Sequence, residues 1–220
     1  MDFDIELWLQ ELTKQLFDIF DDRIKFIGLQ GSYKRGEAND SSDIDVVILL
    51  DKLNFDDLQQ YKKILQSMPD NEKACGFICG ENELYNWPKS DLFQLSQDTI
   101  SLYGNLENFI PTIEKSDIED FVKINSANLY HQMSHAYLFE DKDINILKQG
   151  YKTAFFILQG MYYLKNGEYP NSKSELLLKL DGENKDILLV NVNWIKLKIS
   201  NNIDFYFEKI INWSSKNISS

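Results

Sequence analysis

The stretch from Gly31 to Leu50 reads GSYKRGEANDSSDIDVVILL. A Gly-Ser turn and a polar loop lead to two aspartates, Asp43 and Asp45, at the start of an apolar run. The run is β-branched and nearly continuous, which predicts a strand over 43–50 that is buried on both faces. Residues i and i+2 of a strand point the same way, so the two carboxylates share one face. Like charges so placed repel, and a bound cation removes that repulsion.

The residues around the Gly-Ser turn predict a phosphate site opposite these carboxylates. Residues 24–30 read as a strand, after which Gly31 and Ser32 open a predicted helix. Glycine lets backbone approach a ligand closely, and a helix N-terminus offers N–H groups to a phosphate. Ser32 adds a hydroxyl donor, while Lys34 and Arg35 would help to neutralise the phosphates. Mg²⁺ suits the aspartates because it is typically held by one or two carboxylates plus substrate phosphates.

Each of these residues also has a simpler interpretation. The two aspartates could mark an exposed strand end, with Ser41 and Ser42 as turn residues. Lys34 and Arg35 could be solvated charges on the first helical turn. The complete spacing, rather than any single residue, favours the binding site.

That spacing resembles a known family. Gly-Ser, ten residues and Asp-x-Asp, with RGEA at 35–38, is similar to the signature of the polymerase-β-like nucleotidyltransferases. It most resembles their small bacterial branch, which includes aminoglycoside and lincosamide nucleotidyltransferases and minimal antitoxin-type enzymes. The likeness covers about residues 26–50 directly.

The resemblance implies roles for individual residues. Gly31 and Ser32 would hold the phosphates of ATP, and Asp43 and Asp45 would ligate two Mg²⁺ ions. The family normally has a third carboxylate on a neighbouring strand, for which we select residues 91–98. Gln94 takes the expected acidic place there, which leaves Asp91 and Asp98 as substitutes. We prefer Asp98 as the third catalytic and metal-binding carboxylate, because on a strand it would point to the same side as Gln94.

The implied activity is Mg²⁺-dependent transfer of a nucleoside monophosphate, AMP from ATP, to a hydroxyl of a small molecule by a two-metal mechanism. An aminoglycoside-like antibiotic is one such acceptor. The alternatives are transfer of AMP to a protein, as in the antitoxin-type relatives, and a nucleotide sensor that has lost turnover. The partners would thus be a nucleoside triphosphate and an acceptor, without nucleic acid or membrane.

Periodicity along the chain predicts an α+β protein with two domains. The first, residues 1–112, would be a mixed-sheet nucleotidyltransferase domain with helices at 5–20 and 55–68 and strands at 24–30, 43–50, 74–78, 92–95 and 100–103. The second, residues 113–220, would be a helical bundle. Its expected helices are one opened by a Ser116–Glu119 capping box, one over 144–164, one over 176–180 after a Ser172–Glu175 capping box, and one over 194–213.

Composition limits the partners and the compartment. The formal net charge of −12 over 220 residues argues against an extended nucleic-acid-binding surface. This negative charge either favours the binding of cationic ligands or serves only to keep the protein soluble. The two cysteines, Cys75 and Cys79, are expected to be buried free thiols. The start of the sequence is unlike a signal peptide, and no apolar run spans a bilayer, so we expect a cytoplasmic protein.

Two further groups of side chains have open interpretations. His131 and His135 share a helix face, where they could bind a metal, line a substrate cleft or simply face solvent. An aromatic-rich group on the helix over 144–164 could form bundle core or a substrate platform; it comprises Phe155, Phe156, Met161, Tyr162 and Tyr163.

Overall fold

The computed structural model describes residues 3–40 and 42–219, so Ser41 of the opening stretch lies outside the described residues. The chain packs into two compact units. The first contains the residues up to Pro88 together with 95–112, and the second contains 89–94 together with 113–220. Residues 89–94 therefore belong with the second unit, although the expected boundary near residue 112 puts them in the first.

The first unit is a mixed four-stranded sheet with helices, as predicted. The strand order is β3-β2-β1-β4, with β2 parallel to β3 and β1 antiparallel to both β2 and β4. The elements are α1 (Ile5–Phe20), β1 (Ile24–Gln30), α2 (Gly31–Lys34), β2 (Ile44–Leu50), α3 (Phe55–Ser67), β3 (Ala74–Gly80), α4 (Glu81–Tyr85), α5 (Lys89–Gln97) and β4 (Ile100–Tyr103). Short 3-10 helices span Asp21–Arg23, Asn71–Lys73 and Leu106–Asn108.

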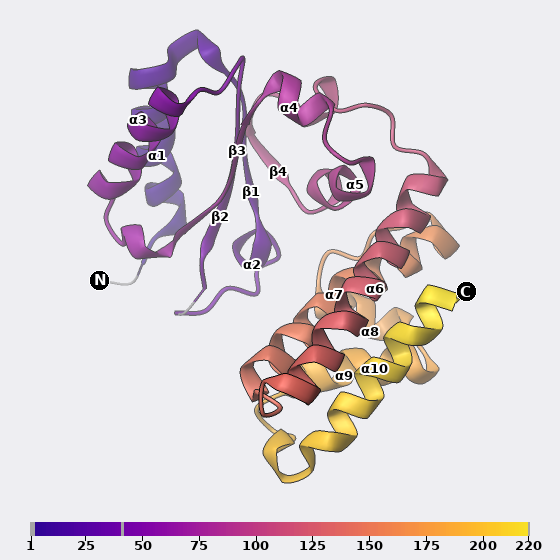
Figure 1. Cartoon of the computed structure of the whole chain (residues 1–220). Coiled ribbons are helices and arrows are strands. Elements are labelled where there is room, and N and C mark those ends of the chain that lie inside the picture. Colours follow the sequence, from indigo (N-terminus) through magenta and orange to yellow (C-terminus); the bar gives the residue numbers. More distant parts are fainter. Residues whose placement is uncertain (1–2, 41, 220) are drawn as a thin grey trace. The chain divides into compact units, whose positions relative to one another are not determined.

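Helices α1 and α3 lie side by side on one face of this sheet (Figure 1). Helix α1 forms because Asp4 caps its first turn and because apolar residues recur at helical spacing. Its buried residues Trp8, Leu12, Leu16 and Phe20 pack in one cluster with the apolar side chains of β1 and β2. This layer anchors the two strands whose adjoining ends carry the Gly-Ser turn and the Asp-x-Asp pair.

The predicted strand over 92–95 is wrong, because these residues lie within helix α5. A short apolar run does not by itself distinguish a strand from a helix, and the proline at position 88 suits the start of a helix. Leu92 and Phe93 are both buried. The Phe93 ring lies 5.4 Å from that of Phe121, and this packing places the start of α5 in the second unit.

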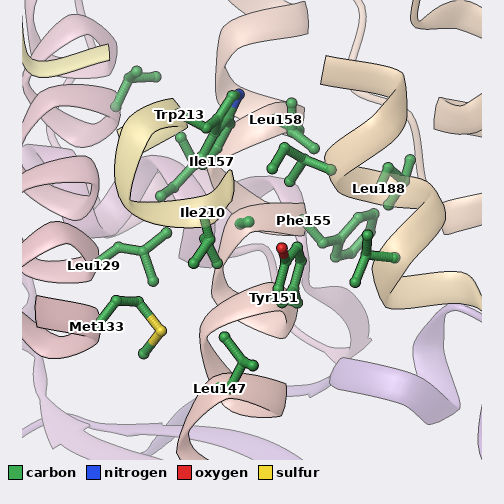
Figure 2. Packing of buried hydrophobic residues seen from close by; sticks show 14 of the residues in the cluster. Leu129, Met133, Leu147, Tyr151, Phe155, Ile157, Leu158, Leu188, Ile210 and Trp213 are labelled. Atoms are coloured by element: carbon green, nitrogen blue, oxygen red, sulfur yellow. The ribbon is translucent and has the colours of Figure 1, made fainter. Parts of the chain in front are cut away.

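The second unit is helical, as predicted. It contains α6 (Lys115–Phe139), α7 (Ile144–Asn166), α8 (Lys173–Lys179), α9 (Gly182–Val192), a 3-10 helix (Ile199–Asn202) and α10 (Ile203–Ser219). Figure 2 shows its core, to which Leu129 and Met133 of α6, Tyr151 and Phe155 of α7, and Trp213 of α10 contribute. Phe155 is fully buried and the other four members of the aromatic-rich group pack against the same cluster, so this group is bundle core.

Several helix boundaries in this unit differ from the prediction. Helix α6 begins one residue before Ser116, and its first turn is closed by Asp117 Oδ2, which accepts a hydrogen bond from the Glu114 amide at 2.7 Å. The stretch expected as one helix over 194–213 is interrupted, because Lys198 adopts a left-handed backbone with φ +44°. Residues 193–198 form turns, a 3-10 helix follows at Ile199–Asn202, and α10 begins at Ile203.

No helix within 3–40 or 42–219 combines the length and the apolar content needed to cross a bilayer.

Candidate functional site

The Gly-Ser turn and the Asp-x-Asp pair meet at one end of the sheet. Antiparallel pairing of β1 with β2 sets Gln30 opposite Asp45, and α2 begins at the next residue, Gly31 (Figure 1). Gly31 has φ +73°, a region that favours glycine, and a Cβ at this position would collide with the Asp45 carboxylate. The backbone at Gly31 therefore lies directly against the Asp45 side chain, which only a glycine allows.

Helix α2 consists of a single turn whose start is available to a ligand. Within the part of the chain that the structure describes, no side chain caps this start at Gln30. Its carbonyls are engaged, since the Arg35 amide donates to Gly31 O at 3.2 Å and the Glu37 amide donates to Ser32 O at 2.9 Å. The N–H groups at the start of the turn and the Ser32 hydroxyl remain as donors of the kind that bind phosphates.

Asp43 and Asp45 lie where the sequence predicts, although β2 begins at Ile44, one residue later than expected. Asp43 is exposed just before the strand, whereas Asp45 is partly buried between Ile44 and Val46, which are fully buried. The alternation puts Asp45 on the opposite side from these apolar neighbours. Both carboxylates thus lie at the N-terminal end of β2, whose other residues are buried in the core.

The strands on either side of β2 offer no carboxylate beside Asp45. Its partner on β1 is Gln30, and its partner on β3 is Cys75. Cys75 is exposed, which corrects the expectation of two buried thiols, while Cys79 is buried. Although the residue is exposed, partial desolvation of its thiol raises the pKa of Cys75, and the carboxylates of Asp45 and Asp43 raise it further. Only the strand register reveals this thiol as part of the site, so the sequence pattern did not identify it.

Asp98 lies between α5 and β4 and pairs with two cations. Arg35 Nη1 donates a hydrogen bond to Asp98 Oδ2 at 2.6 Å, and Lys34 Nζ lies 3.6 Å from Asp98 Oδ1. The three side chains are only 4–6% exposed. The prediction that Gln94 and Asp98 point to the same side of a strand is wrong, because residues 89–97 form helix α5. Asp91 is exposed on that helix, and Gln94 is partly buried.

The donor set at the strand end fits Mg²⁺ held together with a nucleotide. Two carboxylates plus phosphate oxygens satisfy the ion's preference for oxygen ligands, and the lack of a side chain at Gly31 lets the Gly-Ser turn lie directly against the Asp45 carboxylate. Among the described residues, no group of three or more His, Cys, Asp or Glu side chains is placed to hold a metal ion. The nucleotide would therefore have to complete the coordination.

His131 and His135 line a separate surface pocket of about 350 Å³ on α6. Both are exposed, and His135 Nδ1 lies 3.6 Å from Glu140 Oε1. Gln132, Ala136 and Ile146 complete the lining. The three polar groups do not form a metal-binding cluster in the described chain, and both histidines are exposed side chains that line this pocket.

Comparisons with known proteins agree with this architecture. A family model described as a nucleotidyltransferase domain matches residues 9–92. A Methanocaldococcus jannaschii protein named "Putative protein adenylyltransferase" is 32% identical over 70 residues, which make up 31% of this chain and 67% of that protein. The crystal structure of spectinomycin adenyltransferase AAD(9) from Enterococcus faecialis, with ATP and spectinomycin, has a TM-score of 0.63 and 14% identity over 99% of this chain and all of that chain.

The matched region contains most of α1 and all of β1, the Gly-Ser turn, β2 and β3, so it includes the elements that build the strand-end site. Similarity to the solved adenyltransferase extends over both units and supports the same overall fold. On the strength of the family model and of the archaeal relative, this chain belongs to the nucleotidyltransferase domain family.

Proposed function

We propose that the protein transfers AMP from ATP to a hydroxyl group of a small molecule. The observation that carries the proposal is the juxtaposition of Gly31 with Asp45, which puts a turn suited to phosphates directly against a carboxylate suited to a cation. ATP as donor is supported by family membership, and by the ATP present in the structure of the spectinomycin adenyltransferase.

In this proposal the chain's residues bind and orient the triphosphate. The N–H groups at the start of α2 and the Ser32 hydroxyl would hold phosphate oxygens, and Asp43 and Asp45 would hold Mg²⁺. The ion, when bound, would neutralise charge that develops on the phosphate oxygens. The acceptor oxygen forms a bond to the α-phosphorus, the bond to the β-phosphate oxygen breaks, pyrophosphate leaves, and the hydroxyl proton passes to a base. Positioning and charge neutralisation supply most of the catalysis in such transfers.

A small, cationic acceptor is the class that the protein's charge favours. The chain carries a formal charge of −12, which attracts cations over the surface as a whole. The solved relative of similar fold was crystallised with spectinomycin, and the similarity covers the helical unit as well as the sheet. Aminocyclitol and aminoglycoside compounds are therefore the first acceptors to test.

The test is a pyrophosphate-release assay with Mg²⁺-ATP and a panel of such acceptors, followed by mass spectrometry of the acceptor. We expect a mass increase of one AMP unit on at least one compound and stoichiometric pyrophosphate. Pyrophosphate release with adenylylated protein substrates, and with no small molecule modified, would instead support the second acceptor class, to which the archaeal relative's name points.

A nucleotide sensor without turnover is the other candidate, and one observation favours it. Both strand neighbours of Asp45 are uncharged or weakly acidic residues, Gln30 and Cys75, so a third carboxylate is missing there. Tight ATP binding with no pyrophosphate release for any acceptor would support the sensor and contradict the transferase.

A further inference from the structure

A buried ionic cluster lies at the C-terminal end of α2, next to the Gly-Ser turn at Gly31–Ser32, which we call the phosphate turn. Lys34 and Arg35, at the end of α2, both reach Asp98, and Lys34 Nζ also donates a hydrogen bond to the Gln97 carbonyl at 3.3 Å. Arg35 Nε lies 3.5 Å from Glu37 Oε2. The side chains of Lys34 and Arg35 are 6% and 4% exposed, so their cationic groups are enclosed by protein instead of extending into solvent.

Asp98 is the carboxylate that both enclosed cations face. Arg35 also lies near the carboxylate of Glu37, whose side chain is more exposed than that of Asp98, at 19%. Removing one partner from a buried ion pair leaves an uncompensated charge, which is far more costly than loss of a surface pair. Without Asp98, two enclosed cations would repel each other, and we expect the turn that carries them to move.

Helix α2 depends on such outside support because it is too short to be stable alone. It has a single turn, and forming one turn fixes several backbone dihedrals in return for very few hydrogen bonds. The Arg35 amide donates the hydrogen bond that closes the turn onto Gly31 O. Arg35 thus connects the turn's backbone to the Asp98 carboxylate, and any displacement of Arg35 is passed to Gly31.

We propose that Asp98 is a positioning residue, which fixes the phosphate turn at Gly31–Ser32 through Lys34 and Arg35. The proposal rests on the proposed nucleotide-binding function and adds a role for these two cations that differs from direct phosphate contact. It also gives Asp98 a different role from that of the metal ligand predicted from the sequence. Asp98 acts on nucleotide affinity through the backbone of α2.

The test compares Asp98→Asn with a matched control, Asp57→Asn. Asp57 forms a buried pair with Arg23 in the same unit, at 2.8 and 2.9 Å, at the start of α3 instead of at the phosphate turn. Both variants lose a buried carboxylate charge beside an arginine. Calorimetric titration of α,β-methylene-ATP with Mg²⁺ then measures the nucleotide Kd, and thermal unfolding measures stability.

We expect both variants to lower Tm, but only Asp98→Asn to raise the nucleotide Kd, by about tenfold, which corresponds to about 1.4 kcal/mol of lost positioning. Asp57→Asn should leave that Kd within about twofold of the wild type, as expected for independent sites. Asp98→Glu keeps the charge and should recover most of the affinity. If Asp98→Asn does not fold, Arg35→Lys is measured instead and should also raise the nucleotide Kd, because it keeps the charge and loses the guanidinium hydrogen bond to Asp98.

The nucleotide Kd and the Mn²⁺ affinity together distinguish a positioning role of Asp98 from metal ligation. Equal nucleotide Kd for the wild type and Asp98→Asn would overturn the positioning role. A selective loss of Mn²⁺ affinity at saturating analogue, measured by EPR, would overturn it in favour of metal ligation by Asp98. Absence of nucleotide binding by the wild type would contradict the proposed function itself, whatever the variants do.

Discussion

Cys75 and Asp45 are paired residues on the parallel strands β3 and β2, so a thiol occupies the place beside the carboxylate where a further acidic group would complete a metal site. The exposed position of Cys75 leaves room for another side chain there. The pairing predicts that an acidic side chain at position 75 would raise the affinity of this site for a metal ion.

Cys75→Asp should tighten metal binding. The new carboxylate would repel Asp45 in the absence of a cation, and a bound ion would relieve that repulsion. We expect the Kd for Mn²⁺, measured by EPR in the presence of α,β-methylene-ATP, to fall by about tenfold. Cys75→Ser, which adds no charge, is the matched control and should leave it nearly unchanged. Equal Mn²⁺ affinity in the two variants would mean that position 75 does not face the metal.

Gly31→Ala should be more damaging than Gly36→Ala, although both glycines have positive φ. Gly36 has φ +66° and open space where a Cβ would project, so alanine there costs only backbone strain, about 1 kcal/mol. At Gly31 the added methyl group also meets the Asp45 carboxylate, which we expect to cost about 2 kcal/mol more. Urea unfolding measures both values. Similar losses from the two substitutions would show that Gly31 does not lie against Asp45.

Asp57 should make stability fall in acid. Its hydrogen bonds from Arg23 hold the pKa of the Asp57 carboxyl below its usual value near 3.8. A lowered folded-state pKa contributes stability that is complete above the unfolded pKa and is lost as pH falls through the folded one. Asp57→Asn should therefore cost about 3 kcal/mol at pH 7 and progressively less below about pH 4. A cost that does not change between pH 7 and pH 3 would argue against the ion pair.

The two thiols should differ in alkylation by iodoacetamide. Burial raises the pKa of Cys79 to about 12 and encloses its sulfur, so it should react only in the unfolded protein. Cys75 is exposed and should react in the folded protein, faster as pH rises. Because the Asp45 carboxylate raises the pKa of Cys75, Asp45→Asn should speed its alkylation at pH 8. An unchanged rate would indicate that the two side chains do not interact.

Much of the first unit follows from local sequence patterns. The caps and spacing of α1, the apolar run of β2 and the glycine at position 31 each act within a few residues, and their consequences can be predicted without the structure. The family resemblance of the stretch 31–50 is confirmed by the family model.

The features that local patterns do not predict depend on contacts between distant segments. The placement of Cys75 beside Asp45 requires the parallel pairing of β3 with β2, and the pairing of Arg35 with Asp98 joins residues 63 positions apart. The strand prediction within α5 is wrong because a four-residue apolar run has no clear period, and the partner of Phe93 lies on another helix. A third carboxylate is therefore not to be found on a strand at these residues.

The most direct test of the central claim is an EPR titration of Mn²⁺ into the protein saturated with α,β-methylene-ATP. Asp45→Asn is compared with Asp51→Asn, which alters a carboxylate just beyond the opposite end of β2, where it pairs with Arg23. Since loss of even an outer-shell partner weakens metal binding roughly 10–100-fold, we predict at least about 100-fold weaker Mn²⁺ binding for Asp45→Asn. Asp51→Asn should bind like the wild type. Equal Mn²⁺ affinity in the wild type and Asp45→Asn would contradict a nucleotide–metal site at this strand end.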